Sequence, residues 1–321
     1  MNKHGKIIIS LDFELLWGIF DVVDYNSKKK YFWQTREIIP EILKLFEEYQ
    51  VHATWATVGM LFNKNWKEWE ENIPSEIPNY RKKTLSAYKF GTSIKSKSTE
   101  EFCFAPELIK LISRTKGQEL ATHTYSHYYC LEEGQTDTSF DKDLAKAVSV
   151  AKSMDIDLKS LVFPRNQLTK EYLQICAKHG IENVRSNPSS WYWKDATSNS
   201  LVNKLARTGD AYVNLGKKTY PASFFSKNVN LPLEQKASRF LRPVEGNRLM
   251  RSSKINRIKN EIEAAAKKNE IYHLWWHPHN FGDHPEESIK DLKEILVHYK
   301  AMQDKYAFQS LNMQELGALY S

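Results

Sequence analysis

Cysteine is scarce in this chain, and long apolar runs are lacking. The 321 residues include three cysteines, Cys103, Cys130 and Cys176, which are widely spaced and form no CxxC pair. This pattern argues against a disulfide framework and a cysteine zinc site, and it favours a reducing compartment. No run reaches the length of a transmembrane helix, and Asp12 and Glu14 interrupt the apolar N-terminal residues, which argues against a signal peptide. We therefore expect a cytoplasmic protein without an integral membrane segment.

A strong bias in composition is also lacking. Hydrophobic residues make up 41% and charged residues 26%, which is typical of a soluble globular protein. The net charge of +7, with a run at residues 28–30, could attract the phosphates of carrier-linked sugars, although solvated surface explains it more simply. No nucleic-acid motif accompanies this charge, so we expect no nucleic-acid partner. The sequence does not indicate an oligomeric state.

Predicted strands and helices alternate along the chain, which is typical of a parallel sheet. We expect strands at residues 6–13, 51–58, 118–122, 160–163, 182–185, 271–276 and 307–311. We expect helices at residues 35–50, 59–69, 106–115, 141–154, 170–179, 255–268 and 285–300. Residues 72–104 are polar and aperiodic, which predicts a long loop, and residues 186–253 predict an elaboration over one face. We interpret residues 1–321 as a single domain.

Chemically reactive residues follow several of the predicted strands. Asp12 and Glu14 end the first strand, His123 and His127 follow the third, and His277 follows the sixth. A closed barrel assembles such residues at the carboxyl ends of its strands, whereas an open sheet would spread them in a row. The sequence therefore favours a barrel.

The sharpest local pattern is His123-Thr124-Tyr125-Ser126-His127. Histidines four apart meet on one face of a helical turn and can bind one metal ion. The alternative interpretation is two histidines on a solvated turn, because so short a motif also occurs by chance. Asp12 and Glu14 project to the same side of an extended strand, so they are candidates for a third ligand and a base. Rim carboxylates in salt bridges are the alternative interpretation.

Two further segments carry candidate site residues. His277 and His279 lie within an aromatic stretch, as expected for a proton donor beside a bound ring, although an aromatic core cluster is the alternative. Arg165 could pair with a carboxylate and fix its charge, or could simply be exposed in a loop.

Taken in order, these segments resemble the polysaccharide deacetylase family, also called the NodB-homology domain or carbohydrate esterase family four. Ser10-Leu11-Asp12-Phe13-Glu14 resembles the family's Thr-Phe-Asp-Asp-Gly motif, and the His123 to His127 stretch matches its His-Ser/Thr-x-x-His motif in full. Phe163-Pro164-Arg165 is similar to a divergent third motif, and the stretch ending at His277 resembles the last strand. The resemblance implies a distorted (β/α)7 barrel.

The resemblance also implies roles for individual residues. Asp12 would be the catalytic base, Arg165 its partner, and His277 the acid, a role for which His279 is the alternative. His123 and His127 would be ligands of one divalent metal ion. The family's adjacent Asp-Asp pair is replaced here, so Glu14 as third ligand rests on geometry and on family members with the same spacing. Zinc suits imidazole and carboxylate ligands best, and manganese, cobalt or nickel would also fit.

The implied activity is hydrolysis of the N-acetyl or N-formyl group of an amino sugar, in a surface polysaccharide or its carrier-linked biosynthetic intermediate. Aromatic and imidazole side chains that we expect to contact the sugar are Trp17, Trp191, Trp276 and His279.

Three other functions remain open at this point. A catalytically impaired, sugar-binding relative is suggested by the replacement of the second aspartate with Glu14. A ring-amide hydrolase would use the same barrel and metal. A glycoside hydrolase would need two carboxylates about 5 to 9.5 Å apart and would leave the histidines without a role.

Overall fold

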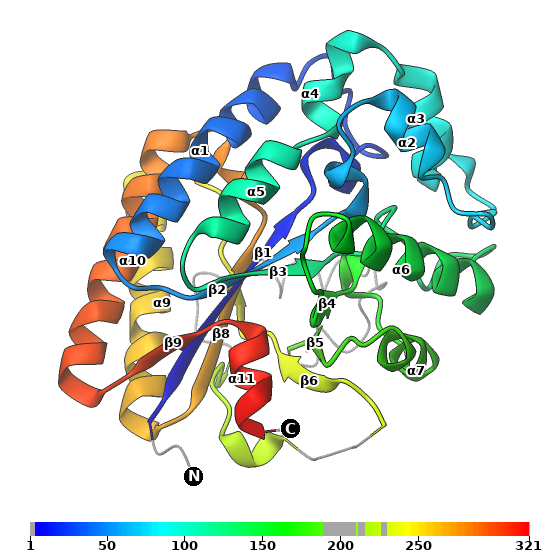
Figure 1. Cartoon of the computed structure of the whole chain (residues 1–321). Coiled ribbons are helices and arrows are strands. Elements are labelled where there is room, and N and C mark those ends of the chain that lie inside the picture. The colour runs from blue at the N-terminus through cyan, green and yellow to red at the C-terminus, as the bar shows by residue number, and fades with distance from the viewer. Residues whose placement is uncertain (1–3, 189–209, 211–215, 226–229, 321) are drawn as a thin grey trace.

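The strands form one parallel sheet whose order largely follows the chain (Figure 1). The computed structural model describes residues 4–188, 210, 216–225 and 230–320. Its strands are β1 (Lys6–Phe13), β2 (Ala53–Thr57), β3 (Gln118–Thr122), β4 (Ser160–Val162), β5 (Asn183–Ser186), β6 (Leu233–Lys236), β7 (Arg239–Phe240), β8 (Ile271–Trp276) and β9 (Gln309–Leu311). The sheet order is β6-β5-β4-β3-β2-β1-β8-β7, and β9 pairs with the start of β1.

A single bent strand joins the two edges of this sheet. β6 pairs with β5, and β7 pairs with β8, yet only two residues separate β6 from β7. Between them, the Ala237 N–H donates to the Ser186 carbonyl at 2.9 Å and the Ser238 N–H to the His273 carbonyl at 2.8 Å. Counting β6–β7 once and leaving out the flanking β9, seven strands line the barrel within the described part of the chain. The predicted distorted (β/α)7 barrel is confirmed.

The segment predicted as an elaboration, residues 186–253, therefore supplies part of the barrel wall. β6 was missed because it is short and polar, with Gln235 facing the interior, where its amide donates to Asn183 Oδ1 at 3.1 Å. Residues 189–209, 211–215 and 226–229 of the predicted elaboration lie outside the described residues.

Helices cover the outside of the barrel (Figure 1). They are α1 (Lys29–Glu48), α2 (Trp66–Glu71), α3 (Ala87–Ile94), α4 (Glu100–Cys103), α5 (Pro106–Arg114), α6 (Asp137–Lys152), α7 (Lys170–Lys178), α9 (Arg248–Lys268), α10 (Pro285–Tyr306) and α11 (Met313–Tyr320). In Figure 1, α1, α10 and α9 run side by side, while α6 and α7 lie on the opposite side. The predicted loop at residues 72–104 was wrong in part, because it contains α3 and α4.

Alternation along β1 separates two apolar layers. Ile7, Ile9, Leu11 and Phe13 pack outward in the large core that also contains the buried faces of the helices. Ile8 points inward and packs in a smaller cluster at the bottom of the barrel, together with Ala56, Ala121, Val162, Met313 and Leu316. The next inward positions toward the carboxyl end of β1 are Ser10 and Asp12, so the interior changes from apolar to polar along the barrel axis.

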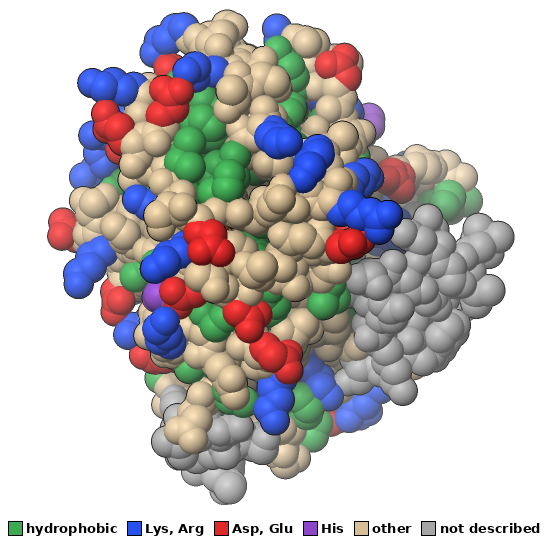
Figure 2. Space-filling model, turned by 90° about the vertical axis from the view of Figure 1, so that its right-hand side faces the viewer, with side chains coloured by type: hydrophobic (Ala, Val, Ile, Leu, Met, Phe, Trp, Pro, Cys, Tyr) green, Lys and Arg blue, Asp and Glu red, His purple; other side chains and the backbone are tan. Residues whose placement is uncertain are grey.

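The outer surface carries charges of both signs. On the face shown in Figure 2, basic and acidic side chains are interspersed, as expected for a solvated surface. Within the described residues, no helix combines the length and apolar character needed to cross a bilayer.

Candidate metal centre and active site

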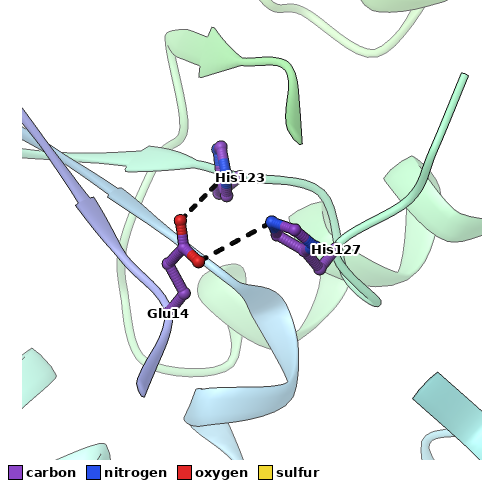
Figure 3. Close-up of side chains that lie close together, drawn as sticks. All are labelled: Glu14, His123 and His127. Carbon is purple, nitrogen blue, oxygen red and sulfur yellow. Dashed lines mark ion pairs between the residues drawn. The ribbon is translucent and has the colours of Figure 1, made fainter. Parts of the chain in front are cut away.

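Three buried side chains converge at the carboxyl ends of β1 and β3 (Figure 3). Glu14 directly follows β1, His123 directly follows β3, and His127 lies in the same loop as His123. Glu14 Oε1 is 3.6 Å from His123 Nε2, and Glu14 Oε2 is 3.7 Å from His127 Nε2. These separations are too long for hydrogen bonds. They are close to the roughly 3.3 Å expected between two ligands at about 2.05 Å in a tetrahedral site.

The loop that carries both histidines is not a helical turn, so the predicted i, i+4 geometry was wrong. Thr124 and His127 have φ angles of 63° and 55°, in the left-handed region. The buried Asp143 carboxylate accepts the N–H groups of Tyr125 at 2.7 Å and Ser126 at 3.1 Å, which fixes this loop. The two imidazole rings still come within 5.1 Å of each other. Strained backbone of this kind is concentrated at functional sites.

Each histidine has a partner on the ring nitrogen that faces away from Glu14. His123 Nδ1 lies 2.8 Å from the Val162 carbonyl, and His127 Nδ1 lies 3.2 Å from Tyr129 Oη. A carbonyl accepts but cannot donate, so His123 carries its hydrogen on Nδ1 and presents Nε2 as a free lone pair. Partners of this kind orient histidines that bind metal ions.

The charge states of the three residues also suit a cation. Burial, together with the charge of Asp12, raises the pKa of Glu14 well above its ordinary value. Burial lowers the pKa of His123 to about 4 and lowers that of His127 well below its ordinary value. The imidazoles are therefore neutral, which is the form that binds metals, and the buried carboxylate is stabilised by a positive charge. Two nitrogens and a carboxylate form a donor set that fits a divalent ion such as zinc.

Gly18 provides the space for the Glu14 carboxylate. A Cβ atom at Gly18 would lie 1.2 Å from Glu14 Oε2. We expect Gly18→Ala to displace this carboxylate and to weaken the affinity for a divalent metal at least about tenfold, as measured by calorimetric titration. The control is Gly91→Ala, which crowds Trp69 instead, with a closest approach of 2.8 Å, and should leave the metal affinity unchanged. Equal affinities in both variants would contradict the proposed role of Glu14.

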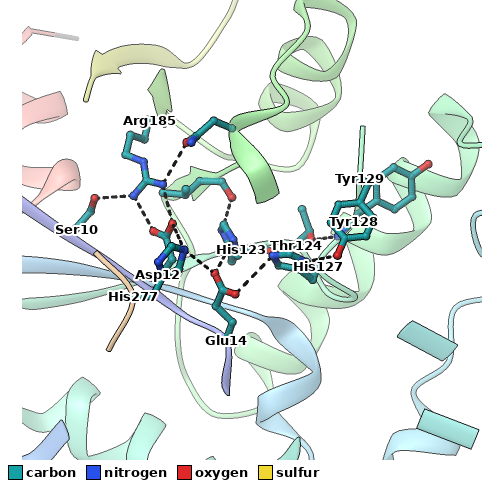
Figure 4. A network of polar contacts seen from close by, with 12 residues as sticks. Ser10, Asp12, Glu14, His123, Thr124, His127, Tyr128, Tyr129, Arg185 and His277 are labelled. Atoms are coloured by element: carbon teal, nitrogen blue, oxygen red, sulfur yellow. Dashed lines mark hydrogen bonds and ion pairs between the residues drawn. The ribbon is translucent and has the colours of Figure 1, made fainter. Parts of the chain in front are cut away.

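A second carboxylate, Asp12, is held by an arginine that the sequence did not indicate (Figure 4). Arg185, on β5, donates from Nη1 to Asp12 Oδ1 and from Nη2 to Asp12 Oδ2, each at 2.7 Å. Arg185 also donates to Ser10 Oγ at 3.0 Å and lies 4.3 Å from the ring of Trp275. Burial raises the pKa of Asp12, but the charge and hydrogen bonds of Arg185 outweigh burial and hold that pKa below its ordinary value. Asp12 is therefore ionised.

The predicted pairing of Arg165 with Asp12 was wrong. Arg165 follows β4 in a short turn with a φ of 53°, and its Nη2 atom pairs with Asp21 Oδ2 at 2.5 Å. Arg185 instead lies within a strand, at an alternate position that faces the barrel interior. The signal that could have found it is a charged residue inside the predicted strand at residues 182–185.

Of the two histidines that follow β8, His277 is the one that approaches the carboxylates. Its Nε2 atom lies 3.3 Å from Glu14 Oε1 and 3.7 Å from Asp12 Oδ2. His279 is buried and stacks on His277, with the ring centroids 4.9 Å apart. Both histidines line the same cleft.

The predicted sugar-binding tryptophans are corrected by the structure. Trp276 points outward into the core and stacks on Phe281, and Trp17 is buried against Trp66 and Trp69. Trp191 lies outside the described residues. Among the described tryptophans, Trp275 lines the cleft. Side chains two apart on a strand share a face, so Trp275 lies on the same side as His277 and Trp276 on the other.

These groups share one cleft of about 450 Å³. Its aromatic wall consists of Trp275 and Phe240, whose ring centroids are 4.6 Å apart. The residues that line the cleft are Asp12, Glu14, Gly18, Ile19, His123, His127, Arg165, Asn166, Phe240, Arg242, Pro243, Glu245, Trp275, His277, His279 and Asn280. Carboxylates, imidazoles and an aromatic wall thus converge on one cavity.

Comparison with known proteins agrees with this geometry. The sequence pattern of the polysaccharide deacetylases matches residues 19–184, which is more than half of the chain. The chain belongs to the polysaccharide deacetylase family. The match includes His123 and His127, whereas Asp12, Glu14, Arg185 and His277 lie outside it. No protein of curated function matches the sequence.

Solved structures share the fold at low sequence identity. One, from Mycobacterium smegmatis and assigned as a polysaccharide deacetylase, has 13% identity and a TM-score of 0.63, with 100% of this chain and 92% of that chain covered. Puue allantoinase has 9% identity and a TM-score of 0.59, with coverages of 99% and 90%. An assigned polysaccharide deacetylase from Pseudomonas aeruginosa PAO1 has 9% identity and a TM-score of 0.56, with coverages of 98% and 89%. These similarities concern the fold.

Proposed function

We propose that this member of the family is a metal-dependent hydrolase that removes the N-acetyl or N-formyl group from an amino sugar. The observation that supports it best is the convergence of Glu14, His123 and His127 beside the ionised Asp12, on the floor of one cleft. A sugar-binding protein would not need a buried carboxylate and two buried neutral imidazoles facing one another. The retained Asp12, Glu14 and histidines therefore favour catalysis over binding alone.

A divalent ion held by Glu14, His123 and His127 would polarise a carbonyl group and lower the pKa of water to about 7. Asp12 then accepts a proton from the attacking water, and Arg185 keeps the Asp12 carboxylate ionised and in place. His277 donates a proton to the departing amine nitrogen. One C–O bond forms and the amide C–N bond breaks, so the products are a carboxylic acid and a free amino sugar.

The substrate that we propose is an acylated amino sugar of a surface polysaccharide, or its carrier-linked precursor. Trp275 and Phe240 form an aromatic wall on which the apolar face of a sugar ring can stack. The buried, unpaired thiols of Cys103, Cys130 and Cys176 fit a reducing compartment, and therefore a precursor made before export.

The proposal is tested by measuring bound metal and acyl release together. Wild-type protein, reconstituted with zinc, manganese or cobalt, is expected to bind about one divalent ion, as measured by elemental analysis. The His123→Ala/His127→Ala double variant should bind none, and chelator should abolish release of acetate or formate from acylated amino sugars. A folded wild type that binds none of these metals would exclude the proposal.

A ring-amide hydrolase is the second candidate function. The same ligands would serve a cyclic amide, and the fold is shared with an allantoinase over nearly the whole chain. Parallel assays with acylated amino sugars and with cyclic ureides, at equal protein and metal concentrations, separate the two functions by the product that is released.

A further inference from the structure

The two histidines of the proposed metal site differ in what holds them. His123 Nδ1 faces a backbone carbonyl, that of Val162, at 2.8 Å, whereas His127 Nδ1 faces the hydroxyl of Tyr129 at 3.2 Å (Figure 4). Val162 is the last residue of β4, so the sheet fixes the position of its carbonyl. The position of the hydroxyl depends on whatever fixes the Tyr129 ring, so the orientation of His127 depends on the surroundings of Tyr129.

The Tyr129 side chain is fully buried and is held from two directions. Its backbone N–H donates to Tyr80 Oη at 2.8 Å, and the Tyr80 ring packs on it with the centroids 5.8 Å apart. The guanidinium of Arg165 lies over the Tyr129 ring, with Cζ 4.3 Å from the centroid. A cation in this position is attracted to the face of the ring.

Arg165 is itself fixed above this ring. Its Nη2 atom pairs with Asp21 Oδ2 at 2.5 Å, and the Asp21 side chain is only 2% exposed. Its Nη1 atom lies 3.9 Å from Glu132 Oε1. The Arg165 backbone is held in the left-handed region, with a φ of 53°. A strained backbone and an ion pair with a buried carboxylate indicate that this placement is specific.

We propose that Asp21, Arg165 and Tyr129 form a positioning relay that holds His127 in the orientation required to bind the metal ion. The inference rests on the proposed function, because it assumes the metal site. Binding through Nε2 leaves the hydrogen of His127 on Nδ1, from which it is donated to Tyr129 Oη. Arg165 holds the Tyr129 ring by packing on its face, and Asp21 holds Arg165 through an ion pair.

The relay assigns a place to the arginine of the third family motif, which does not reach Asp12 here. Arg185 holds Asp12, and Arg165 acts on the opposite side of the site, through a metal ligand. Tyr129 and Arg165 are thus positioning residues, and their substitution should change metal binding even when no substrate is present.

The test is a titration of metal-free protein with Co²⁺, followed by its visible absorption. Tyr129→Phe is expected to weaken Co²⁺ affinity about 10–100-fold and to change the absorption bands, since partners of metal ligands have effects of this size. Arg165→Gln should weaken affinity by a smaller factor. The Tyr129→Phe/Arg165→Gln double variant should be no weaker than Tyr129→Phe, because Arg165 acts through Tyr129.

The matched control is Tyr128→Phe. It removes a neighbouring hydroxyl that bonds with Ser139 Oγ at 2.7 Å and not with His127, so Co²⁺ affinity and spectrum should match the wild type. Circular dichroism checks that every variant is folded. If Tyr129→Phe does not fold, Arg165→Gln alone tests the relay. A Co²⁺ affinity equal to that of the wild type in Arg165→Gln would then overturn it.

Wild-type Co²⁺ affinity in folded Tyr129→Phe, or multiplicative effects in the double variant, would also overturn the relay. A wild-type protein that binds no Co²⁺ would overturn the proposed metal site and the relay together, so the two failures are distinguishable.

Discussion

Asp12→Asn is expected to leave the bound metal in place and to lower kcat/KM for deacylation by about 10²–10⁴-fold. The amide keeps the shape of the carboxylate but cannot accept a proton from water. Metal content by elemental analysis and initial rates of acid release, measured on the same preparation, check both parts of this prediction.

Glu14→Gln is the matched comparison, because it makes the same chemical change two residues further along. It should lose both metal and activity, since Glu14 and not Asp12 lies between His123 and His127. If Asp12→Asn lost the metal and Glu14→Gln kept it, the roles of ligand and base would have to be exchanged.

Arg185→Met is expected to lower the free energy of unfolding by about 3–5 kcal/mol at neutral pH, because it leaves the Asp12 carboxylate buried without its partner. Denaturant unfolding measures this change. The native pair holds the pKa of Asp12 below its ordinary value, so its stabilisation is present above the unfolded pKa and is lost as pH falls through the folded pKa. The difference in the free energy of unfolding between wild type and Arg185→Met should therefore become smaller at acid pH.

Two further variants show whether this loss of stability arises from the Arg185–Asp12 ion pair. Asp12→Asn/Arg185→Met removes both charges and should recover part of the lost stability. Arg81→Met removes an arginine whose ion pair with Glu133 is exposed on both sides, with side-chain exposures of 80% and 70%, and should cost about 1 kcal/mol or less. Equal losses for Arg81→Met and Arg185→Met would contradict the assignment of Arg185 as the partner of a buried Asp12.

Much of the fold and of the proposed metal site could be predicted from local sequence. The alternation of β1 places Asp12 and Glu14 on one side, and the His123 to His127 motif directly follows a strand. These relations extend over a few residues, so the pattern is visible without the fold. The left-handed residues Thr124 and His127 were not predicted, because spacing alone does not distinguish a helical turn from a strained loop.

The rest of the site depends on contacts between distant strands. Arg185 and Asp12 are 173 positions apart, and no short motif connects them. The family pattern, which ends at residue 184, also stops before Arg185. By contrast, the prediction that Trp276 contacts the sugar was a local error. Side chains alternate along a strand, so Trp275, two residues before His277, is the one on the inner side.

The bent β6–β7 strand has a mechanical consequence for the cleft. β7 has two residues, Arg239–Phe240, and its ladder with β8 is equally short, so this seam is held by few backbone hydrogen bonds. Phe240 forms part of the aromatic wall directly at the seam. We therefore expect the barrel wall to open more readily at this seam than along β1 and β3, which carry the proposed metal ligands.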